Sequence, residues 1–377
     1  MAIKQQQFVQ QAKSIKQPKK VPQYKGWKDE LQSLLNANKH IRMNGKDSSN
    51  ETQQKLCDFL FMYFHFLREN GFACDPHNLK QKHIQLFCDH LAGKGKDGKV
   101  RSAATIQTYL YFLNLFCRWI GKDGMVGDTK QYFADPNILK RSYAATTDKS
   151  WEGNGVDVKA KIDEISVNYP WVAAHILVEH AFGLRRKEAV SLRPYMNFIE
   201  GNLHIVSGGK GGKSRIIPIE SDYQRDVSAL AISMVGKTSK ELKEPLLNLK
   251  QNLSKTSRVC TKYGITKKAL GVTRHGNRCG YAINFMLSHG LTPLIKGGEI
   301  GALPKDQEME IRLQTSQRLG HNRVGITTAY SGAFTESGKV RAEKASFQQQ
   351  ASKNQLAGDE LGDGQLVSEL EAAENKA

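Results

Sequence analysis

The chain has 377 residues, a formal net charge of +18 and a sequence pI near 9.5. Its length predicts two folded domains, and its hydrophobic content of 39% is ordinary for a globular protein. No apolar run approaches the roughly 20 residues that span a bilayer, and the start of the chain is rich in lysine and glutamine. These features argue against a membrane or secreted protein, so we expect a soluble, cytoplasmic protein without a membrane partner.

The first part of the chain is strongly basic. Residues 1–28 contain seven lysines and no acidic residue. Such a segment cannot bury enough apolar surface to fold alone, so residues 1–47 are predicted to form a basic arm, with room for one short helix at Trp27–Asn36. The excess of positive charge indicates a polyanionic partner such as nucleic acid, and a basic protein that is merely soluble is the alternative.

Residues 48–142 are predicted to form a small, all-helical domain. Apolar residues recur at helical spacing in three stretches, from near Ser48 to Gly71, over Asn78–Leu91 and over Ala103–Ile120. Ser48 and Glu51 have the spacing of a capping box. The aromatic residues of the third stretch favour a core role over stacking on bases.

A loop rich in glycine and lysine separates the second and third helices. Its basic residues either contact a DNA backbone or form a solvated loop, and the sequence leaves both possibilities open. The candidate DNA-binding residues of this loop are Lys94, Lys96, Lys99 and Arg101.

The second half of the chain changes character after a predicted linker at 143–160. Residues 161–182 have a helical pattern, and Asn197–Ile199, Leu203–Val206 and Ser214–Ile219 alternate like short strands. More helices follow to about residue 335. The predicted fold class is therefore mainly α with a small antiparallel β-sheet, with a catalytic domain at 161–340. Residues 341–377 form a partly acidic tail, either a docking helix or a disordered segment.

The cysteine pattern does not indicate a metal site or a disulfide framework. None of the six cysteines forms a C-x-x-C pair, and we expect all of them to be reduced. Cys74 and His77 could begin a zinc site, but no matching second pair follows. The sequence also lacks a Walker-type phosphate-binding loop, so ATP is not implied.

Four separated patches hold an unusual set of polar residues. They are GLRRKEAVSL at 183–192, GKGGKSRIIP at 209–218, HGNR at 275–278, and LGH at 319–321 with Tyr330 nine residues after the histidine. Each patch alone has an ordinary structural explanation, such as an ion pair between Arg185 and Glu188 at i,i+3 spacing. Together and in this order, they resemble the motifs of the tyrosine recombinase (phage integrase) family.

The resemblance implies a role for each matching residue. Arg185 and Arg278 would clamp the non-bridging oxygens of the scissile phosphate, and Tyr330 would be the nucleophile. His275 would act as general base in cleavage and general acid in rejoining, Lys210 would protonate the leaving 5′ oxygen, and His321 would hydrogen-bond the phosphate. Glu188 would hold Arg185 in position. Lys213 and Arg215 are further candidates for contact with DNA.

The resemblance also implies an architecture and a set of partners. The two domains would form a C-shaped clamp on double-stranded DNA, and four protomers would exchange strands between two recombination sites through a Holliday junction. No metal, ATP or other cofactor would be required. A mobile-element integrase in a prokaryotic cell, associated with the nucleoid and aided by DNA-bending or directionality factors, is the favoured biological setting.

Two other functions remain open from the sequence. One is a type IB topoisomerase-like strand transferase, and the other is a non-catalytic or regulatory DNA-binding protein on the same fold. The chain also departs from the family pattern. Asn277 stands where leucine is usual, Cys279 and Gly280 follow Arg278 where another histidine is common, and an insertion is expected around 289–312.

Overall fold

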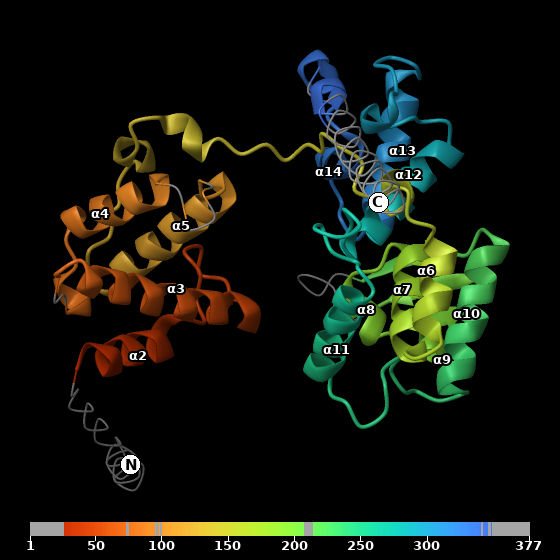
Figure 1. Cartoon of the computed structure of the whole chain (residues 1–377), viewed down its shortest axis with the longest axis horizontal. Helices are drawn as coiled ribbons and strands as arrows, with labels where there is room; N and C mark the ends of the chain where they lie inside the picture. Colours follow the sequence, from red (N-terminus) through yellow and green to blue (C-terminus); the bar gives the residue numbers. More distant parts are fainter. Residues whose placement is uncertain are drawn as a thin grey trace, which may run out of the picture. The chain divides into compact units, whose positions relative to one another are not determined.

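The computed structural model of the chain describes residues 26–72, 75–93, 95, 98, 100–206, 214–340, 342–345 and 348 (Figure 1). These residues are mainly helical and contain one three-stranded antiparallel sheet, which confirms the predicted fold class. The chain divides into two units, one ending at Ser142 and the other beginning at Tyr143. The C-shaped clamp concerns how the two units sit together, and it stays a prediction.

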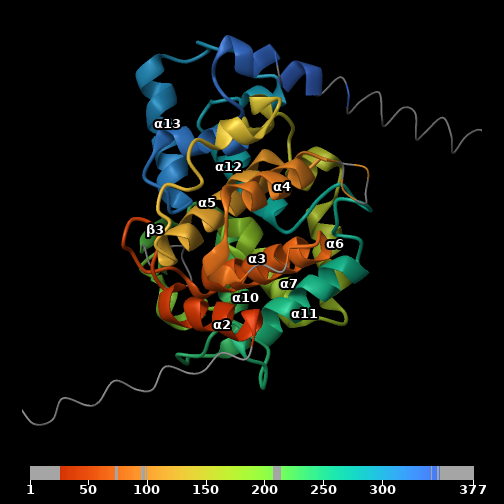
Figure 2. The same cartoon turned by 90° about the vertical axis from the view of Figure 1, so that its left-hand side faces the viewer.

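The first unit is built around one long helix. Its α-helices are α2 (Trp27–Asn38), α3 (Asn50–Glu69), α4 (Gln81–Ala92) and α5 (Ala103–Trp119). Its short 3₁₀ helices are η1 (Pro76–Asn78), η2 (Thr129–Tyr132) and η3 (Pro136–Leu139). Helix α3 lies between α2 on one side and α4 and α5 on the other (Figures 1 and 2).

The predicted helices of the first unit are present, with two refinements at their ends. Helix α3 is capped by Ser49, whose side chain accepts a hydrogen bond from the backbone N–H of Thr52, and not by Ser48 as the capping-box spacing predicted. Ser48 Oγ instead donates to the carbonyl of Lys39. In α5, Leu110 and Phe116 are buried, as the predicted core role of this helix requires.

Helix α2 belongs to the core of the first unit. Leu31 and Leu35 are fully buried there, together with residues of α3, α4 and α5. The short helix that the sequence predicts at Trp27–Asn36, within the arm 1–47, is therefore present and packed into the core. Residues 1–25 lie outside the described residues.

Helix α7 (Pro170–Phe182) is the centre of the second unit. It contacts α6, α8, α10, α11 and α12, and nine of its 13 residues are buried. A helix that is apolar nearly all round can only be stable when it is surrounded. The remaining α-helices are α6 (Val158–Ser166), α8 (Arg186–Val190), α9 (Pro194–Asn197), α10 (Asp222–Val235), α11 (Leu249–Lys262), α12 (His275–Ser288), α13 (Lys305–Arg318) and α14 (Thr328–Ser331).

The sequence predicts one helical stretch at 161–182, but the structure has two helices there. Helix α6 ends at Ser166 and α7 begins at Pro170. Proline is tolerated in the first turn of a helix and disfavoured in its interior, because it lacks an N–H group and its ring clashes with the preceding turn. Pro170 therefore starts a new helix.

The sheet consists of β1 (Phe198–Ile199), β2 (Asn202–Ile205) and β3 (Arg215–Pro218) in the order β1-β2-β3. Both pairs are antiparallel, and Ile205 pairs with Arg215 where β2 and β3 approach their connecting loop. Residues alternate between buried and exposed along β3, so Arg215 and Ile217 face inward while Ile216 faces outward.

Residues 143–160, predicted to be a linker, belong to the second unit. Trp151 is fully buried in a cluster with residues of α6, α7 and α11. Its indole N–H donates to the carbonyl of Thr273 over 2.9 Å. The low apolar content of this segment predicted a linker, but its one large buried side chain, Trp151, holds the segment against the rest of the unit.

The insertion expected around 289–312 has local structure of its own. It contains the 3₁₀ helix η5 (Leu294–Lys296) and the first turns of α13. The other 3₁₀ helices of the second unit are η4 (Glu152–Asn154) and η6 (Val324–Thr327). Most of the tail from 341 onward lies outside the described residues, although 342–345 are helical and Ala342 is buried.

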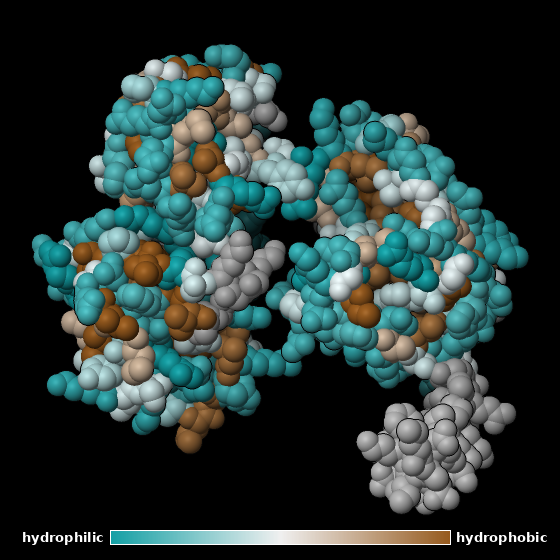
Figure 3. Space-filling view, turned by 180° about the vertical axis from the view of Figure 1, so that it is seen from behind, coloured by the Kyte–Doolittle hydropathy of each residue, from teal (hydrophilic) through white to brown (hydrophobic). Residues whose placement is uncertain are grey.

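The surface of both units is mostly hydrophilic on the face seen in Figure 3, with hydrophobic residues in small groups. None of the described helices combines the length and the apolar character needed to cross a membrane.

Candidate active site

The site begins at the turn between α7 and α8. Gly183 ends α7 with φ +61°, and a Cβ atom there would lie 2.5 Å from Cδ1 of Tyr281. Glycine meets both demands, because it tolerates positive φ and carries no side chain. The turn delivers Arg185 to the N-terminal end of α8, with its side chain 24% exposed.

Glu188 binds two arginines at once. One of its carboxylate oxygens accepts hydrogen bonds from Nη1 of Arg185 (2.7 Å) and Nη1 of Arg215 (2.9 Å). The other accepts from the backbone N–H of Arg185 (2.8 Å) and Nη2 of Arg215 (2.7 Å). Burial alone would raise the pKa of Glu188, but the hydrogen bonds and charge of Arg215, followed by those of Arg185, lower it to about 2. The carboxylate is therefore ionised and fixes the orientation of Arg185.

Arg278 is the buried arginine of the site. It lies on the first turn of α12, is 2% exposed, and donates from Nη1 to the carbonyl of Gly183 and from Nη2 to the carbonyl of Leu319. Its third contact runs from Nε to the hydroxyl of Tyr330, over 3.3 Å. Two backbone carbonyls thus set the plane of the guanidinium, and Nε points at the phenol.

The turn at 319–321 brings the two arginines together. The carbonyl of Leu319 accepts hydrogen bonds from Nη2 of Arg278 and from Nη2 of Arg185, the second over 3.1 Å. Nε2 of His321 lies 3.3 Å from the same Arg185 atom and 3.5 Å from the Arg278 atom. Gly320 has φ +68°, which suits glycine, and a Cβ there would lie only 3.1 Å from Nη1 of Arg215. Two guanidiniums and an imidazole therefore share one small volume.

Tyr330 lies on the four-residue helix α14 and is 6% exposed. Besides its contact with Arg278, its ring centroid is 6.2 Å from that of His275. The nucleophile predicted from the sequence therefore lies in the site of its own chain, beside the predicted base.

His275 is the first residue of α12 and is more exposed than the other four candidates that the structure describes. Partial burial, and then the positive charges of Arg278, Lys149 and Arg185, lower the pKa of His275. These surroundings favour the neutral imidazole, which is the form that can accept a proton.

The start of α12 is held by an ion pair that the sequence analysis did not single out. Arg274, directly before His275, donates from Nε and Nη2 to the carboxylate of Glu179 on α7, and both side chains are almost fully buried. Burial raises the pKa of Glu179, while the charge of Arg274 opposes this shift. A glutamate in the apolar run of α7 was the only signal in the sequence, since its partner lies 95 residues away.

Several predicted residues lie away from the cluster or outside the described part of the chain. Arg215 is 9% exposed and is bound to Glu188 and to the carbonyl of Arg318, so its predicted contact with DNA competes with a buried ion pair. Arg101 is exposed. The predicted residues outside the described range are Lys94, Lys96, Lys99, Lys210 and Lys213.

The departures from the family pattern are buried residues of α12. Asn277 is fully buried, and neither polar atom of its amide has a hydrogen-bond partner. Cys279 is buried, and burial raises the pKa of its thiol to about 11. Gly280 packs near Ser150 and Glu152. These residues belong to the packed part of the helix that carries His275 and Arg278.

The described residues contain no group of three or more His, Cys, Asp or Glu side chains arranged to hold a metal ion. The five cysteines among them are all free thiols, and Cys74 lies outside the described range.

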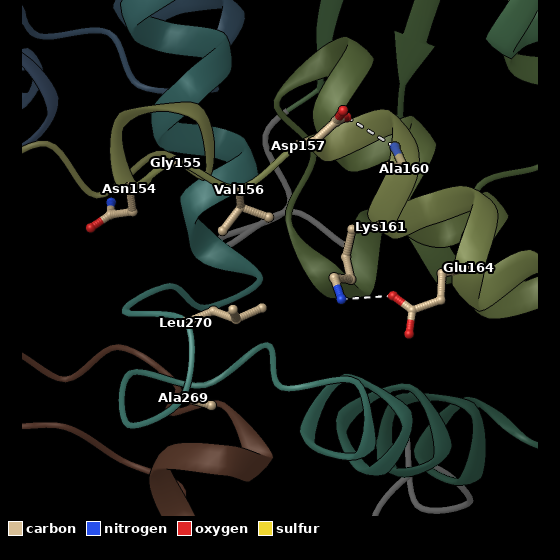
Figure 4. Close-up of a pocket in the computed structure, with 9 residues that line it drawn as sticks. All are labelled: Asn154, Gly155, Val156, Asp157, Ala160, Lys161, Glu164, Ala269 and Leu270. Atoms are coloured by element: carbon tan, nitrogen blue, oxygen red, sulfur yellow. Dashed lines mark hydrogen bonds and ion pairs between the residues drawn. The ribbon is translucent and has the colours of Figure 1, made fainter. Parts of the chain in front are cut away.

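An open pocket of about 450 Å³ lies elsewhere in the second unit, between η4, α6 and Ala269–Leu270 (Figure 4). Its charged groups are already engaged. Asp157 accepts from the backbone N–H of Ala160, and Lys161 pairs with Glu164 over 2.7 Å. The pocket contains none of the candidate catalytic residues, so it is no part of this site.

Comparison with known proteins gives structural similarities and no sequence match. No family model and no curated protein matches the sequence. A lambda integrase dimer bound to a COC′ core site shares 14% identity, with 80% of this chain and 77% of that chain covered and a TM-score of 0.49. The Tn1549 transposon integrase in complex with circular intermediate DNA shares 14% identity, with 83% of this chain and 98% of that chain covered and a TM-score of 0.49. XerA recombinase shares 18% identity, with 86% of this chain and 98% of that chain covered and a TM-score of 0.34.

These three proteins are integrases or recombinases, the kind of enzyme that the sequence motifs resemble. The function of this chain is inferred from its own side chains.

Proposed function

We propose that this protein is a site-specific DNA recombinase that cleaves and rejoins DNA through a covalent bond between Tyr330 and a 3′ phosphate. The proposal rests on one observation above all. The hydroxyl of Tyr330 lies 3.3 Å from Nε of Arg278, in a cluster where Arg278 and Arg185 both approach the ring of His321.

This geometry suits attack on a phosphodiester. A free phenol has a pKa of about 10, so at neutral pH it needs a base to remove its proton or a cation to stabilise the phenolate. Arg278 supplies the cation by direct contact with the phenol. His275, with its lowered pKa and its ring 6.2 Å from that of Tyr330, is the base in cleavage and the acid in rejoining.

The second requirement of the reaction is that the site stabilise the negative charge that develops on the phosphate. The non-bridging oxygens gain negative charge in the transition state, and fixed donors lower the energy of that state more than mobile ones. Arg185 and Arg278 are both fixed, one by Glu188 and the other by two backbone carbonyls. His321 adds a hydrogen bond to the phosphate. The phosphotyrosine ester conserves the energy of the broken bond, so rejoining needs neither ATP nor a metal ion.

Lys210 completes the proposed chemistry as the acid that protonates the leaving 5′ oxygen. Lys210→Ala should slow cleavage of ordinary DNA. A substrate with sulfur in place of the bridging 5′ oxygen should restore the rate, because a thiolate leaves without a proton. A Lys210→Ala variant that remains equally slow on the sulfur substrate would assign the lysine to phosphate binding instead.

The proposal extends to the assembly and its biological role. Four protomers act on two double-stranded sites and exchange strands through a Holliday junction, for integration or excision of a mobile element. The two units act as a clamp on DNA, and the net charge of +18 gives binding a steep dependence on salt. Accessory DNA-bending or directionality factors would set the outcome.

A trapping experiment tests the proposal. The full chain is incubated with nicked duplexes drawn from the DNA that flanks its gene, and covalent complexes are separated on denaturing gels. The wild type should form an adduct, and Tyr330→Phe should bind the same DNA without forming one. An adduct without strand exchange between two duplexes would indicate a topoisomerase-like activity, and binding without any adduct would indicate a DNA-binding protein that is not an enzyme.

A further inference from the structure

The nucleophile helix α14 is too short to hold itself in place. It has four residues, from Thr328 to Ser331, and a single helical turn gains little from its own hydrogen bonds. Its position, and with it the position of the Tyr330 hydroxyl, must therefore be set by neighbouring segments.

One neighbour is the segment that begins the second unit. The backbone N–H of Ala145 donates to the carbonyl of Thr328 over 2.8 Å. A Cβ on Gly332, which follows α14 with φ +81°, would lie 3.4 Å from the carbonyl oxygen of Ala145. The segment at 145 thus touches α14 at its first residue and just beyond its last.

The insertion is a second neighbour, and α14 also contacts η6 and α12. The same Cβ position on Gly332 lies 3.2 Å from Cβ of Leu294 and 3.4 Å from Cγ2 of Ile295. Both belong to η5, so the insertion and the 145 segment both lie beside the end of α14.

An ion pair joins the 145 segment to η5. Nζ of Lys296, at the end of η5, lies 2.8 Å from Oδ2 of Asp148. The side chain of Asp148 is 9% exposed and that of Lys296 is 35% exposed. Asp148 is itself fixed, because its other carboxylate oxygen accepts from the backbone N–H of Ser150 over 2.7 Å and its carbonyl accepts from Asn154.

The geometry points to Asp148 and Lys296 as positioning residues. Their ion pair joins the segment at 145–148 to η5, and these two joined segments, called the clasp below, hold α14 and so Tyr330 in the site of its own chain. The inference rests on the proposed function for its catalytic consequence. It gives the insertion a role, since η5 of the insertion is one of the two segments of the clasp. Neither residue touches the reacting atoms, and their effect runs through α14.

The variants for the test are Lys296→Met, which removes the charge and keeps most of the side-chain volume, and Asp148→Asn, which breaks the pair from the other side. Asp148→Asn keeps an oxygen that can accept from Ser150. Lys296→Arg is the conservative rescue. Lys159→Met is the matched control, because Lys159 pairs with Asp163 over the same 2.8 Å on the exposed face of α6.

Two measurements decide the matter. The first is the single-turnover rate of adduct formation as a function of DNA concentration. Lys296→Met and Asp148→Asn should lower the saturating rate about fivefold, in keeping with a partly exposed ion pair, and leave the half-saturating concentration unchanged. Lys296→Arg and Lys159→Met should behave as the wild type. The second is amide hydrogen exchange of residues 326–333 in the free protein, which should be faster in the two broken-pair variants only.

Opposite results overturn the inference. Unchanged exchange at 326–333 would mean that the pair does not hold α14, and faster exchange with an unchanged cleavage rate would mean that holding α14 does not position Tyr330. A loss that appears only in the half-saturating concentration would make Lys296 a DNA contact. If the wild type itself forms no adduct, the proposed function fails, and exchange alone then decides whether the clasp exists.

Discussion

Replacing Glu188 by glutamine should destabilise the second unit by about 3 kcal/mol. The carboxylate is buried and accepts four hydrogen bonds, two of its partners being guanidiniums. The drop in its pKa from 4.5 to about 2 corresponds to a preference for the ionised form of about 3 kcal/mol. Glutamine would leave Arg215 as a buried, unpaired cation and turn an N–H₂ group toward other N–H donors.

The pH dependence of this effect has a definite sign. Since the pKa of Glu188 is depressed in the folded protein, its contribution is complete above pH 4.5 and is lost as the pH falls through about 2. The glutamine variant has no such group. The difference in stability between wild type and Glu188→Gln should therefore be largest near neutral pH and should shrink below pH 4.5.

The assay must report on the second unit alone, because each unit has its own core. Urea titration followed by hydrogen exchange of peptides from α8 and β3 meets that need. Glu164→Gln is the control, since Glu164 pairs with Lys161 at the surface, and it should change stability by less than about 0.5 kcal/mol. A loss below about 1 kcal/mol for Glu188→Gln at neutral pH, or a loss that persists undiminished at pH 2, would refute the reasoning.

Three other predictions concern the site. Lys149→Met should raise the pKa of His275, so that cleavage is lost at a higher pH as the solution is acidified; an unmoved acidic limb of the pH–rate profile would refute this. Arg278→Lys should slow single-turnover cleavage at least about 100-fold while DNA binding is kept, because an ammonium cannot reach the Tyr330 hydroxyl and two carbonyls at once; near-normal cleavage would contradict it. Gly183→Ala should lower the urea midpoint of the second unit, because its Cβ meets the ring of Tyr281 at positive φ, and an unchanged midpoint would count against the described turn.

Local patterns predicted the helices of the first unit and the three strands of the sheet. The apolar periodicity of α3, α4 and α5 and the alternation of β2 and β3 are local signals, and both survive in the structure. The break at Pro170 could have been predicted as well, since proline disrupts a helix interior. The burial of Trp151 could not, because its partners in α7 and α11 are distant in sequence.

For the candidate site too, the motifs identified some residues but did not indicate all of their contacts. Motif order identified Arg185, Arg278, His321 and Tyr330 as candidates, and the structure brings these four together. The predicted pairing of Glu188 with Arg185 is present, and the structure adds Arg215 as a second partner that no motif indicated. Arg215 lies on the inward face of β3 and pairs with Glu188, and its contact with DNA stays a prediction.

Contacts between distant loops had no counterpart in the sequence. The carbonyl of Leu319, which receives both arginines, is a backbone group without any sequence signal. The pair of Lys296 with Asp148 joins the insertion to the predicted linker, and neither sequence pattern indicated such a contact. Such contacts depend on tertiary packing, which a single sequence does not display.

Residue-level mapping of the covalent bond tests the central claim most directly. DNA trapped on the wild-type protein is digested, and the modified peptide is sequenced by mass spectrometry. The account predicts a nucleotide joined through its 3′ phosphate to the oxygen of Tyr330, in the peptide that follows His321. A nucleotide on any other side chain, or an adduct that persists in Tyr330→Phe, would contradict it.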